Sequence, residues 1–461
     1  MSNSIKFSSL DLQPTLISNL VDIGYEEMTL VQAQTLPQMI DGSDVLARAK
    51  TGSGKTAAFG LSLLNKLDAT SFRTQALVLC PTRELADQIA KEIRRLARGI
   101  LNIKILTLCG GVPLRPQLAS LQHSPHIIVG TPGRVLQHLG KETVKLAYLE
   151  TLVLDEADRM LDMGFAEELD AILKFVPKDR QTLLFSATYA ESIAAVSKRV
   201  QRSPIKVDVT NDEQPVQIMQ FWCSVTRENR NTDLVRALYA WGGELNLVFC
   251  NTKVDCSEVV NYLRSQNIAA LALHGDLDQS ERTEVLVRFA NRSASVLIAT
   301  DVAARGLDVK DLDAVFNYEL PKQAEIYVHR IGRTARAGKQ GVAVSLVGPR
   351  EERRWQEIDE LLSDANPTKC GIPDAKRSAN PLSPSMTTIQ ISGGRKNKLR
   401  PGDLLGVLTA DGGVPGDSVG SIDLFDTYSY VAVRNAQTPK ALRQLAKRPI
   451  KGRMYRARVK K

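Results

Sequence analysis

The stretch TLVLDEADRML, from Thr151 to Leu161, decides the fold because it joins an unbroken apolar run to a cluster of acids. Apolar residues that do not alternate with polar ones are typical of a strand covered by helices on both faces of a parallel sheet. Asp155, Glu156 and Asp158 follow this run directly. Burying an isolated carboxylate is costly, so two interpretations stay open. Either a cation such as a nucleotide-borne magnesium ion balances the acids, or the strand ends in a solvated turn.

Seven other apolar runs of this kind alternate with segments of helical character. Nearly every run ends in Thr, Asp, Ser, Gly or Asn, which places polar groups at the carboxyl ends of strands, where open parallel sheets bind ligands. The sequence therefore predicts an α/β protein with two doubly wound parallel sheets. The runs are ALVLCPT, HIIVGTP and LLFSAT before residue 190, and LVFCNT, AALALHG, VLIATD and AVFNYELP after residue 245.

A chain of 461 residues exceeds what one hydrophobic core usually organises. Two polar segments divide it: DVTNDEQPVQ, residues 208–217, and a stretch rich in Pro, Ser and Asn, residues 363–386. The second segment has the composition of a semi-flexible tether. We expect a first sheet domain at 1–208, a second sheet domain at 217–365, a linker at 366–386 and a small C-terminal domain at 387–461.

The expected C-terminal domain combines a regular element pattern with strong positive charge. Its segments predict the order βαββαβ, the split α+β pattern used by small RNA-recognition modules. Residues 380–461 contain fifteen Lys and Arg against five Asp, a net charge of +10, whereas the rest of the chain has a net charge of −1. This segment is therefore expected to bind nucleic acid or another polyanion. Alternatively, it only keeps the protein in solution.

The remaining composition excludes several classes of protein. With 43% hydrophobic and 24% charged residues, the chain is neither a fibre nor globally disordered. The first thirty residues show no apolar leader, and no apolar stretch reaches the length of about 18 residues that a membrane span needs. The six cysteines form no CxxC pair, so we expect reduced thiols. A cytoplasmic protein with no membrane partner is the resulting expectation.

A phosphate-binding loop is predicted at ARAKTGSGKTAAF, residues 47–59, between an apolar run and a helix. Its glycines allow a tight turn whose N–H groups point at phosphate oxygens. Lys55 can reach the β and γ phosphates, and the hydroxyl of Thr56 can ligate magnesium. A glycine-rich turn with an incidental lysine is the alternative. The residues of the loop expected to bind the nucleotide are Ala49, which replaces the usual first glycine, Lys50, Thr51, Gly52, Ser53, Gly54, Lys55 and Thr56.

The acids of the opening stretch complete a hydrolytic site if they share a sheet with this loop. Asp155 can then hold the magnesium ion together with Thr56, while Glu156 polarises a water for in-line attack on the γ phosphate. With Lys55, these acids are the predicted catalytic residues of the first sheet domain.

Asp158 lies two residues after Glu156 and has a different expected role. A link from its carboxylate to the hydroxyl of Ser186 or Thr188, in the motif FSAT, would couple hydrolysis to the next strand. Alternatively, either hydroxyl only caps a strand end.

The segment YVHRIGRTARAG, residues 327–338, gathers Arg330, Arg333 and Arg336 in the second sheet domain. Arginines that complete a phosphoryl-transfer site accelerate it by about 10³ to 10⁵-fold. Their supply from the second domain would make hydrolysis depend on domain closure. A solvated basic helix is the alternative.

Eight short motifs resemble, in their order, those of the DEAD-box ATP-dependent RNA helicases. They are GYEEMTLVQAQ, AKTGSGKT, PTRELA, TPGR, DEAD, SAT, ATDVAARGLD and HRIGRTARAG, within about residues 1–365. The resemblance implies two tandem RecA-like domains and an RNA-stimulated ATPase that uses ATP and Mg²⁺. With its basic end, the whole chain resembles the bacterial DEAD-box protein A subfamily. That subfamily has an RRM-like C-terminal domain that recognises a 23S rRNA hairpin, and its members act in large-subunit assembly.

The same resemblance implies further nucleotide contacts. Phe7 resembles the aromatic residue that stacks on adenine, and Gln32 the side chain that reads the adenine edge, which would select ATP over GTP. Asp308 resembles the residue that contacts the ribose from the second domain. Arg333 and Arg336 resemble the arginine fingers.

Contacts to RNA are implied by motifs on both sheets. Glycines, hydroxyls and helix N-termini predominate, which suits phosphate and 2′-OH contacts without base reading. We expect sequence preference to come instead from the basic loop GGRKNKLR, residues 393–400, and the strand KGRMYRARVKK, while Tyr428 and Tyr430 either stack a base or pack in the core. The predicted RNA-binding residues are Pro81, Thr82, Arg83, Gly110, Gly111, Thr131, Arg134, Gly275, Gln279, Arg282, Thr300, Arg395, Lys396, Lys398 and Arg400.

These features predict an ATP-dependent RNA helicase that opens short RNA duplexes by local strand separation. Its expected partners are 23S rRNA and pre-50S particles, and no obligate protein partner is indicated. An ATP-gated RNA clamp that does not unwind and a DNA translocase of the same superfamily are the alternatives.

Overall fold

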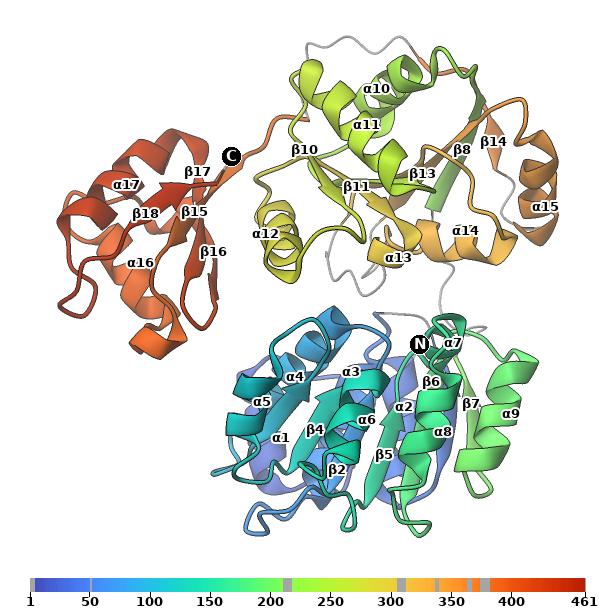
Figure 1. Ribbon diagram of the computed structural model, residues 1–461, viewed down its shortest axis with the longest axis vertical. Helices are drawn as coiled ribbons and strands as arrows, with labels where there is room; N and C mark the ends of the chain where they lie inside the picture. Colours follow the sequence, from blue (N-terminus) through green and yellow to red (C-terminus); the bar gives the residue numbers. More distant parts are fainter. Residues whose placement is uncertain are drawn as a thin grey trace. The chain divides into compact units, whose positions relative to one another are not determined.

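The computed structural model describes residues 5–49, 52–209, 218–304, 312–335, 340–362, 367–373 and 382–460. Four residues of the predicted nucleotide site, Lys50, Thr51, Asp308 and Arg336, lie outside the described residues. The chain forms two compact units, one containing the first sheet domain and the other containing the second sheet domain together with the C-terminal domain (Figure 1).

The first sheet domain is built on a seven-stranded sheet in the order β3-β4-β2-β5-β6-β1-β7. All pairs of neighbouring strands are parallel; Thr151, for example, lies between Ala76 and Gln181. The strands are β1 (Val45–Arg48), β2 (Ala76–Leu79), β3 (Ile105–Leu108), β4 (Ile127–Gly130), β5 (Thr151–Leu154), β6 (Gln181–Ser186) and β7 (Ile205–Asp208).

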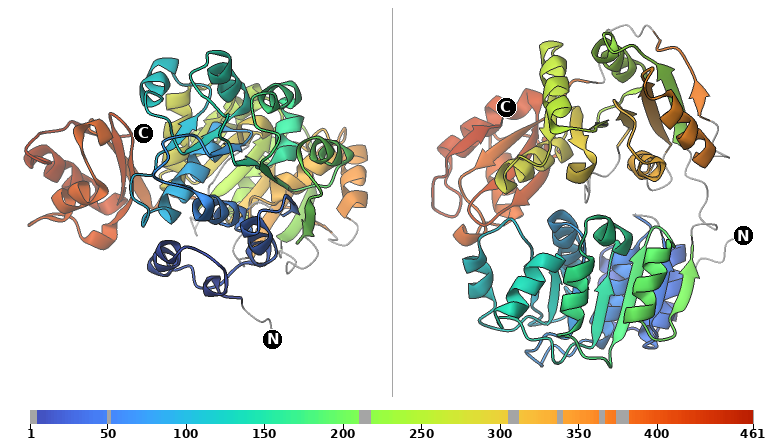
Figure 2. Two further views of the ribbon diagram at one scale, coloured as in Figure 1. Left: turned by 90° about the horizontal axis from the view of Figure 1, so that it is seen from below. Right: turned by 45° about the vertical axis from the view of Figure 1, so that its right-hand side comes forward.

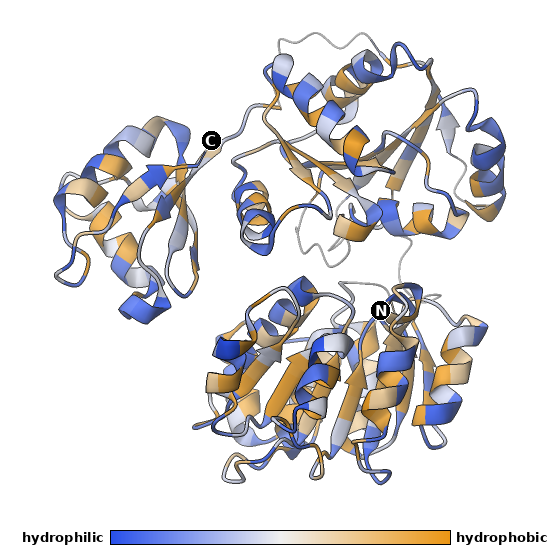
Figure 3. Cartoon of the chain, viewed as in Figure 1, coloured by the Kyte–Doolittle hydropathy of each residue, from blue (hydrophilic) through white to orange (hydrophobic). Residues whose placement is uncertain are grey.

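Helices cover both faces of this sheet, which is why its central strands read as unbroken apolar runs. Successive strand side chains point to opposite faces, so Val153 packs toward α1–α4 whereas Leu152 and Leu154 pack toward α6–α9. The views in Figure 2 show the two helical layers, and Figure 3 shows apolar strands between them. The helices are α1 (Pro14–Asp22), α2 (Leu30–Ile40), α3 (Lys55–Lys66), α4 (Arg83–Leu96), α5 (Leu114–Ser120), α6 (Pro132–Gly140), α7 (Ala157–Asp162), α8 (Ala166–Leu173) and α9 (Glu191–Val200), after a 3₁₀ turn at Phe7–Ser9.

The second sheet domain repeats this plan with the order β10-β11-β9-β12-β13-β8-β14, again entirely parallel. Its strands are β8 (Ile218–Ser224), β9 (Asn246–Cys250), β10 (Ala270–Leu273), β11 (Val296–Thr300), β12 (Ala314–Asn317), β13 (Gly341–Val347) and β14 (Thr368–Lys369). Its helices are α10 (Arg230–Trp241), α11 (Lys253–Ser265), α12 (Gln279–Ala290), α13 (Asp301–Ala304), α14 (Ala324–Ile331) and α15 (Glu352–Leu362).

Part of the segment expected to be a linker belongs to this second sheet. Strand β14 lies within residues 366–386 and pairs with β8. Further on, Leu382 is buried in the hydrophobic core that α10 and α11 form on the sheet.

The C-terminal domain has a four-stranded antiparallel sheet in the order β16-β17-β15-β18, with two helices on one face. Its elements follow the predicted order βαββαβ. They are β15 (Met386–Ile391), α16 (Pro401–Thr409), β16 (Val419–Leu424), β17 (Ser429–Arg434), α17 (Thr438–Lys447) and β18 (Ala457–Val459). The predicted fold class, two RecA-like parallel-sheet domains followed by an RRM-like domain, is confirmed.

Five of the six cysteines are buried, and Cys370 is half-buried. All six are free thiols, as the absence of a paired spacing predicted. Among the helices that the structure describes, none combines the length and the apolar character that a bilayer crossing requires.

Asp44 fixes the start of β1, the strand that leads into the phosphate loop. Its buried carboxylate accepts the N–H groups of Thr182, at 2.7 Å, and Arg202, at 2.6 Å. An unpaired buried amide costs about 1–3 kcal/mol, so Asp44→Ala should lower the Tm of the first domain by at least about 5 °C. Differential scanning calorimetry measures this, with the exposed Asp41→Ala as control. An equal change in both variants would contradict the assignment.

Candidate active site and nucleic-acid interface

The carboxyl ends of the first sheet carry two groups of predicted residues. Strands β5, β6 and β1 are neighbours and lead into the DEAD acids, the SAT motif and the phosphate loop. Strands β3, β4 and β2 are also neighbours and lead into the first-domain RNA motifs. Because parallel strands end at the same edge, the two groups occupy adjacent halves of one edge of the sheet.

The phosphate loop turns through left-handed glycines. Gly52 has φ +90° and Gly54 has φ +99°. A Cβ atom on Gly54 would lie 2.6 Å from Nε2 of Gln32 and 2.9 Å from Oγ1 of Thr29. Position 54 therefore requires glycine for its backbone conformation and for the close approach of α2.

Lys55 and Thr56 open helix α3 behind this turn. The buried Lys55 ammonium donates a hydrogen bond to the carbonyl of Ala49 at 3.0 Å and lies 4.0 Å from Oδ1 of Asp155. Thr56 is half-buried beside it in the chain. The structure thus brings the loop lysine and the first acid of the DEAD motif together.

The acids lie where β5 passes into α7. Asp155 accepts the N–H of Glu156 at 3.0 Å, and Glu156 has the left-handed φ of +51°. Burial raises the pKa of Asp155 to about 6, although Lys55 opposes this effect. A buried carboxylate whose negative charge is only partly balanced is suited to bind a divalent cation. Mg²⁺ typically takes only one or two protein ligands besides phosphate and water. Asp155 and Thr56 are suited to that role.

Asp158 reaches the neighbouring strand, but through a different group from the one expected. Its Oδ2 accepts the N–H of Ala187 at 3.1 Å, immediately after β6. The Ser186 hydroxyl instead accepts the N–H of Thr188 at 3.1 Å, which makes it a local turn contact. The link between the DEAD and SAT motifs therefore runs through a backbone amide.

The predicted adenine-side residues lie next to the phosphate loop. The Gln32 side chain accepts the N–H of Thr29 at 2.8 Å and donates to the carbonyl of Gly54 at 3.1 Å. An antiparallel bridge between Lys6 and Glu27 places the segment of Phe7 beside the chain that enters α2. The Phe7 ring is buried.

A polar cluster holds the first-domain RNA motifs. Arg134 donates to Oε1 of Gln117 at 2.8 Å and to the carbonyl of Val112 at 3.0 Å, and Thr131 Oγ1 accepts the N–H of Gly110 at 3.4 Å. The motifs gave no signal for Gln117, which also contacts His138 at 2.9 Å. Gln117 positions Arg134, and only the fold reveals it.

The neighbouring PTR motif and the left-handed glycine complete this group. Thr82 caps α4 by accepting the N–H of Leu85 at 3.3 Å, and Arg83 starts the helix. Gly111 has φ +74°.

In the second sheet domain, the predicted RNA residues gather at adjacent strands β10 and β11. Gly275 follows β10, Gln279 begins α12, and Thr300 ends β11. Arg282 donates to the carbonyl of Ala303 at 2.6 Å, which ties α12 to the segment after Thr300.

The three arginines of the basic motif differ in their surroundings. Arg330 is only 1% exposed and makes a two-pronged pair with Asp301, at 2.7 and 2.8 Å. It also bonds to Asn251 and Asn317, so it ties four segments of the domain together. Arg333, one turn later, is half-exposed. Ala335 has φ +57°, a left-handed conformation that a glycine would adopt more easily.

The basic loop of the C-terminal domain is solvent-facing, since Arg395, Lys396, Lys398 and Arg400 are all accessible at the surface. The aromatic residues differ from one another: Tyr430 is buried, whereas the half-exposed Tyr428 stacks on Phe425 at 4.9 Å between ring centroids.

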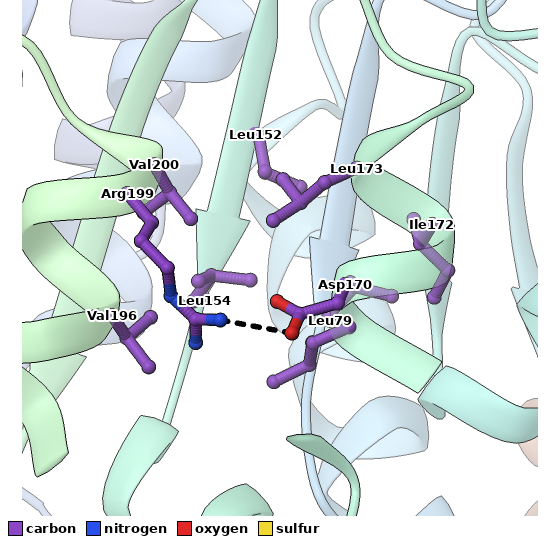
Figure 4. Close-up of a pocket in the computed structure, with 10 residues that line it drawn as sticks. Leu79, Leu152, Leu154, Asp170, Ile172, Leu173, Val196, Arg199 and Val200 are labelled. Atoms are coloured by element: carbon purple, nitrogen blue, oxygen red, sulfur yellow. Dashed lines mark hydrogen bonds and ion pairs between the residues drawn. The ribbon is translucent and has the colours of Figure 1, made fainter. Parts of the chain in front are cut away.

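A small cavity in the first domain, with room for about one water molecule, has none of these residues in its lining. Figure 4 shows its leucine- and valine-rich walls beside the 2.8 Å ion pair of Arg199 with Asp170. Its apolar lining gives no group for phosphate or nucleobase recognition.

Comparison with known proteins agrees with this geometry. Residues 29–196 match the DEAD/DEAH box helicase family, residues 229–338 the helicase conserved C-terminal domain, and residues 388–459 the DbpA RNA binding domain. The chain is 52% identical to the ATP-dependent RNA helicase DbpA of Escherichia coli over 99% of both chains. It is 44% identical to the DEAD-box ATP-dependent RNA helicase CshA of Bacillus cereus, covering 77% of this chain and 67% of that one.

A solved helicase structure has a similar fold over most of the chain. S. cerevisiae Dbp5 bound to RNA and ADP BeF3 is 29% identical, with a TM-score of 0.72 over 80% of this chain and 96% of the other. The chain belongs to the DEAD-box ATP-dependent RNA helicases, a family of RNA-stimulated ATPases, and it carries a DbpA-type RNA-binding domain.

The raised pKa of Asp155 predicts that the ligand-free protein is less stable at pH values at which this carboxyl is ionised. Its carboxyl titrates at about 6 in the folded protein, against 3.8 ordinarily. The folded state therefore holds the proton more tightly, and stability falls as the pH rises from about 4 to about 6. Asp155→Asn should raise the Tm at pH 7.5 by about 5 °C and leave it unchanged near pH 4.

Thermal melts in the presence of a chelator measure this difference. Asp162→Asn, an exposed acid on the same short helix, is the control. A lower Tm for Asp155→Asn at pH 7.5, or an equal gain at both pH values, would contradict the assignment.

Proposed function

We propose that this helicase locally unwinds short duplexes of 23S rRNA during assembly of the large ribosomal subunit. The observation that carries the proposal is the association of the helicase sheets with a DbpA RNA binding domain at residues 388–459. A relative named ATP-dependent RNA helicase DbpA, similar over 99% of its length, supports an RNA helicase with the same domain composition. The concentration of positive charge after residue 380 supplies the electrostatics for RNA.

In the proposed hydrolysis site, Lys55 and the N–H groups of the glycine turn bind the β and γ phosphates. Asp155 and Thr56 would hold Mg²⁺, which would supply positive charge to neutralise the phosphates. Glu156 orients the attacking water as general base. Its backbone has the left-handed φ of +51° where β5 passes into α7.

Two hydrogen bonds supply the proposed coupling within the first domain. Gln32 contacts Gly54, so the side chain that reads adenine also senses the phosphate turn. Asp158 contacts Ala187, so a shift at the acids moves the segment after β6. We infer that Phe7 covers the adenine and that Asp308, Arg333 and Arg336 complete the site from the second domain.

RNA binding is divided in this proposal. Residues at the ends of β2, β3, β4, β10 and β11 hold the backbone without reading bases. The exposed loop Arg395–Arg400 recognises the ribosomal sequence. An RNA clamp that does not unwind is the remaining alternative, and a strand-displacement assay separates the two activities.

Glu156→Gln tests the role of the second acid. The substitution keeps the shape of the side chain and removes its basicity, so ATP and RNA binding should persist while RNA-stimulated turnover falls at least about 100-fold. ATP hydrolysis and nucleotide affinity are measured on the intact protein.

Glu142→Gln is a matched control, because Glu142 is exposed and also left-handed, with φ +53°. It should leave turnover unchanged. Near-normal hydrolysis by Glu156→Gln would remove Glu156 from the catalytic role.

Substituting Arg395, Lys396 and Lys398 together by Gln tests the recognition loop. Loss of sequence-reading contacts should weaken binding of a 23S rRNA hairpin at least about 10-fold more than binding of an unrelated duplex of equal length. The control removes the same charge from α17, by Gln at Lys440, Arg443 and Lys447.

Titrations at two salt concentrations separate charge from recognition, since each lost phosphate contact reduces the salt slope by roughly 0.7–0.9. Equal loss of preference in both triple variants would show that the loop acts only through its charge.

A further inference from the structure

Part of one face of the C-terminal sheet is buried although no helix of its own domain covers it, while Gln390 on the same face stays half-exposed. Strand register places Thr388 opposite Ala432 and Gln390 opposite Tyr430, on the face away from α16 and α17. In a two-layer domain this face would meet solvent. Thr388, Tyr430 and Ala432 are nevertheless 0%, 1% and 1% exposed.

Helix α12 of the second sheet domain and the residues after it cover this face. The Thr388 hydroxyl bonds to the Ser293 hydroxyl at 2.7 Å and accepts from Nδ2 of Asn291 at 3.3 Å. Lys460, next to β18, pairs with Glu284 of α12. Burial raises the pKa of Tyr430, and the Glu284 carboxylate raises it further, which places that acid near the tyrosine.

The chain that joins the two domains is also held at this point. Leu382 packs in the core of the second sheet domain, and its carbonyl accepts the Ser295 hydroxyl at 2.5 Å. The N–H of Met386, the first residue of β15, donates to the carbonyl of Arg292 at 3.3 Å. Residues 382–386 therefore leave no free tether between the last contact of one domain and the first strand of the next.

We propose that the C-terminal domain docks through this sheet face onto α12 and works as one rigid body with the second sheet domain. The part of the sheet face around Thr388, Tyr430 and Ala432 is then closed to RNA, and recognition uses surfaces that stay exposed, such as the loop Arg395–Arg400. Tyr430, whose ring packs against Phe425 and Tyr428 of its own domain and lies near Glu284, is buried beside the interface and is not a platform for a base.

Because α12 carries both proposed RNA contacts and the docked face, the docking affects which RNA is unwound. This step rests on the proposed function. Its first turn carries Gln279 and Arg282, which are proposed to hold the RNA backbone, and its later turns carry Glu284 and Arg288 at the docked face. A helix of this length is a rigid spacer of about 18 Å. The docked domain thereby fixes the separation between the recognised hairpin and the duplex that is opened.

A charge exchange tests the docking without RNA. Glu284→Lys and Lys460→Glu each place like charges together at the interface, whereas the double exchange restores the pair. Spin labels at the exposed positions 261 on α11 and 443 on α17, in a Cys370→Ser background, report the distance between the domains. We expect one narrow distance distribution in the parent protein, a broad one in each single variant and a narrow one in the double variant.

Glu258→Lys, an exposed charge reversal on α11, is the control and should keep the narrow distribution. A broad distribution in the parent, or a narrow one in both single variants, would overturn the docking.

A second measurement addresses substrate choice. Strand displacement is followed on RNAs that carry a 23S hairpin and a duplex separated by spacers of increasing length. The parent should show one optimal spacer, and Glu284→Lys should lose at least about 5-fold in rate at that optimum while it binds the isolated hairpin as tightly as the parent. Weakened hairpin binding by Glu284→Lys would overturn the proposal, because it would mean that the covered face reads RNA. A parent that ignores the hairpin would contradict the proposed function, and the distance measurement would still decide the docking.

Discussion

The approach of Lys55 to Asp155 is the interaction on which the active site depends. At 4.0 Å the ammonium is too far away for a hydrogen bond to the carboxylate, and it donates instead to the carbonyl of Ala49. The buried acid is therefore left with incomplete compensation, and its pKa rises to about 6. A bound cation and phosphate chain would supply the missing partners of both side chains. The incomplete pairing that suits the site to its ligands therefore also lowers the stability of the ligand-free protein.

The parallel sheet turns this local arrangement into a divided surface. Only the strand order determines that β5, β6 and β1 end side by side while β3, β4 and β2 end beside them. Contacts across the chain, from Gln32 to Gly54 and from Asp158 to Ala187, then join motifs that are 22 and 29 residues apart. In each contact the side chain bonds to a backbone group. A small displacement of the side chain is therefore passed directly to the main chain of the other motif.

The sequence predicted the central strands and the motif residues because both leave local patterns. The edge strand β7 was not among the predicted runs, since its first two residues are exposed and its apolar pattern is broken. By contrast, β13 has an unbroken run, GVAVSLV, that the same criterion would have found. The roles of Gln117 and of buried Arg330, and the Ala187 partner of Asp158, could not be predicted from local pattern, because they depend on which distant segments the fold brings into contact.

The division of charge along the chain now has a structural counterpart. Residues before 380 carry almost no net charge, so the RNA contacts proposed for them would depend on placed hydroxyls, helix N-termini and a few arginines rather than on a long-range field. The positive charge belongs to a domain whose sheet contacts α12 and the residues after it through Thr388 and Lys460, and whose basic loop is exposed. The proposed function thus assigns the attraction of RNA and the positioning of RNA to different surfaces. If the two domains form one rigid body, the strongest source of attraction also sets the geometry of the substrate, and specificity then depends on the length of one helix as well as on the side chains that read the bases.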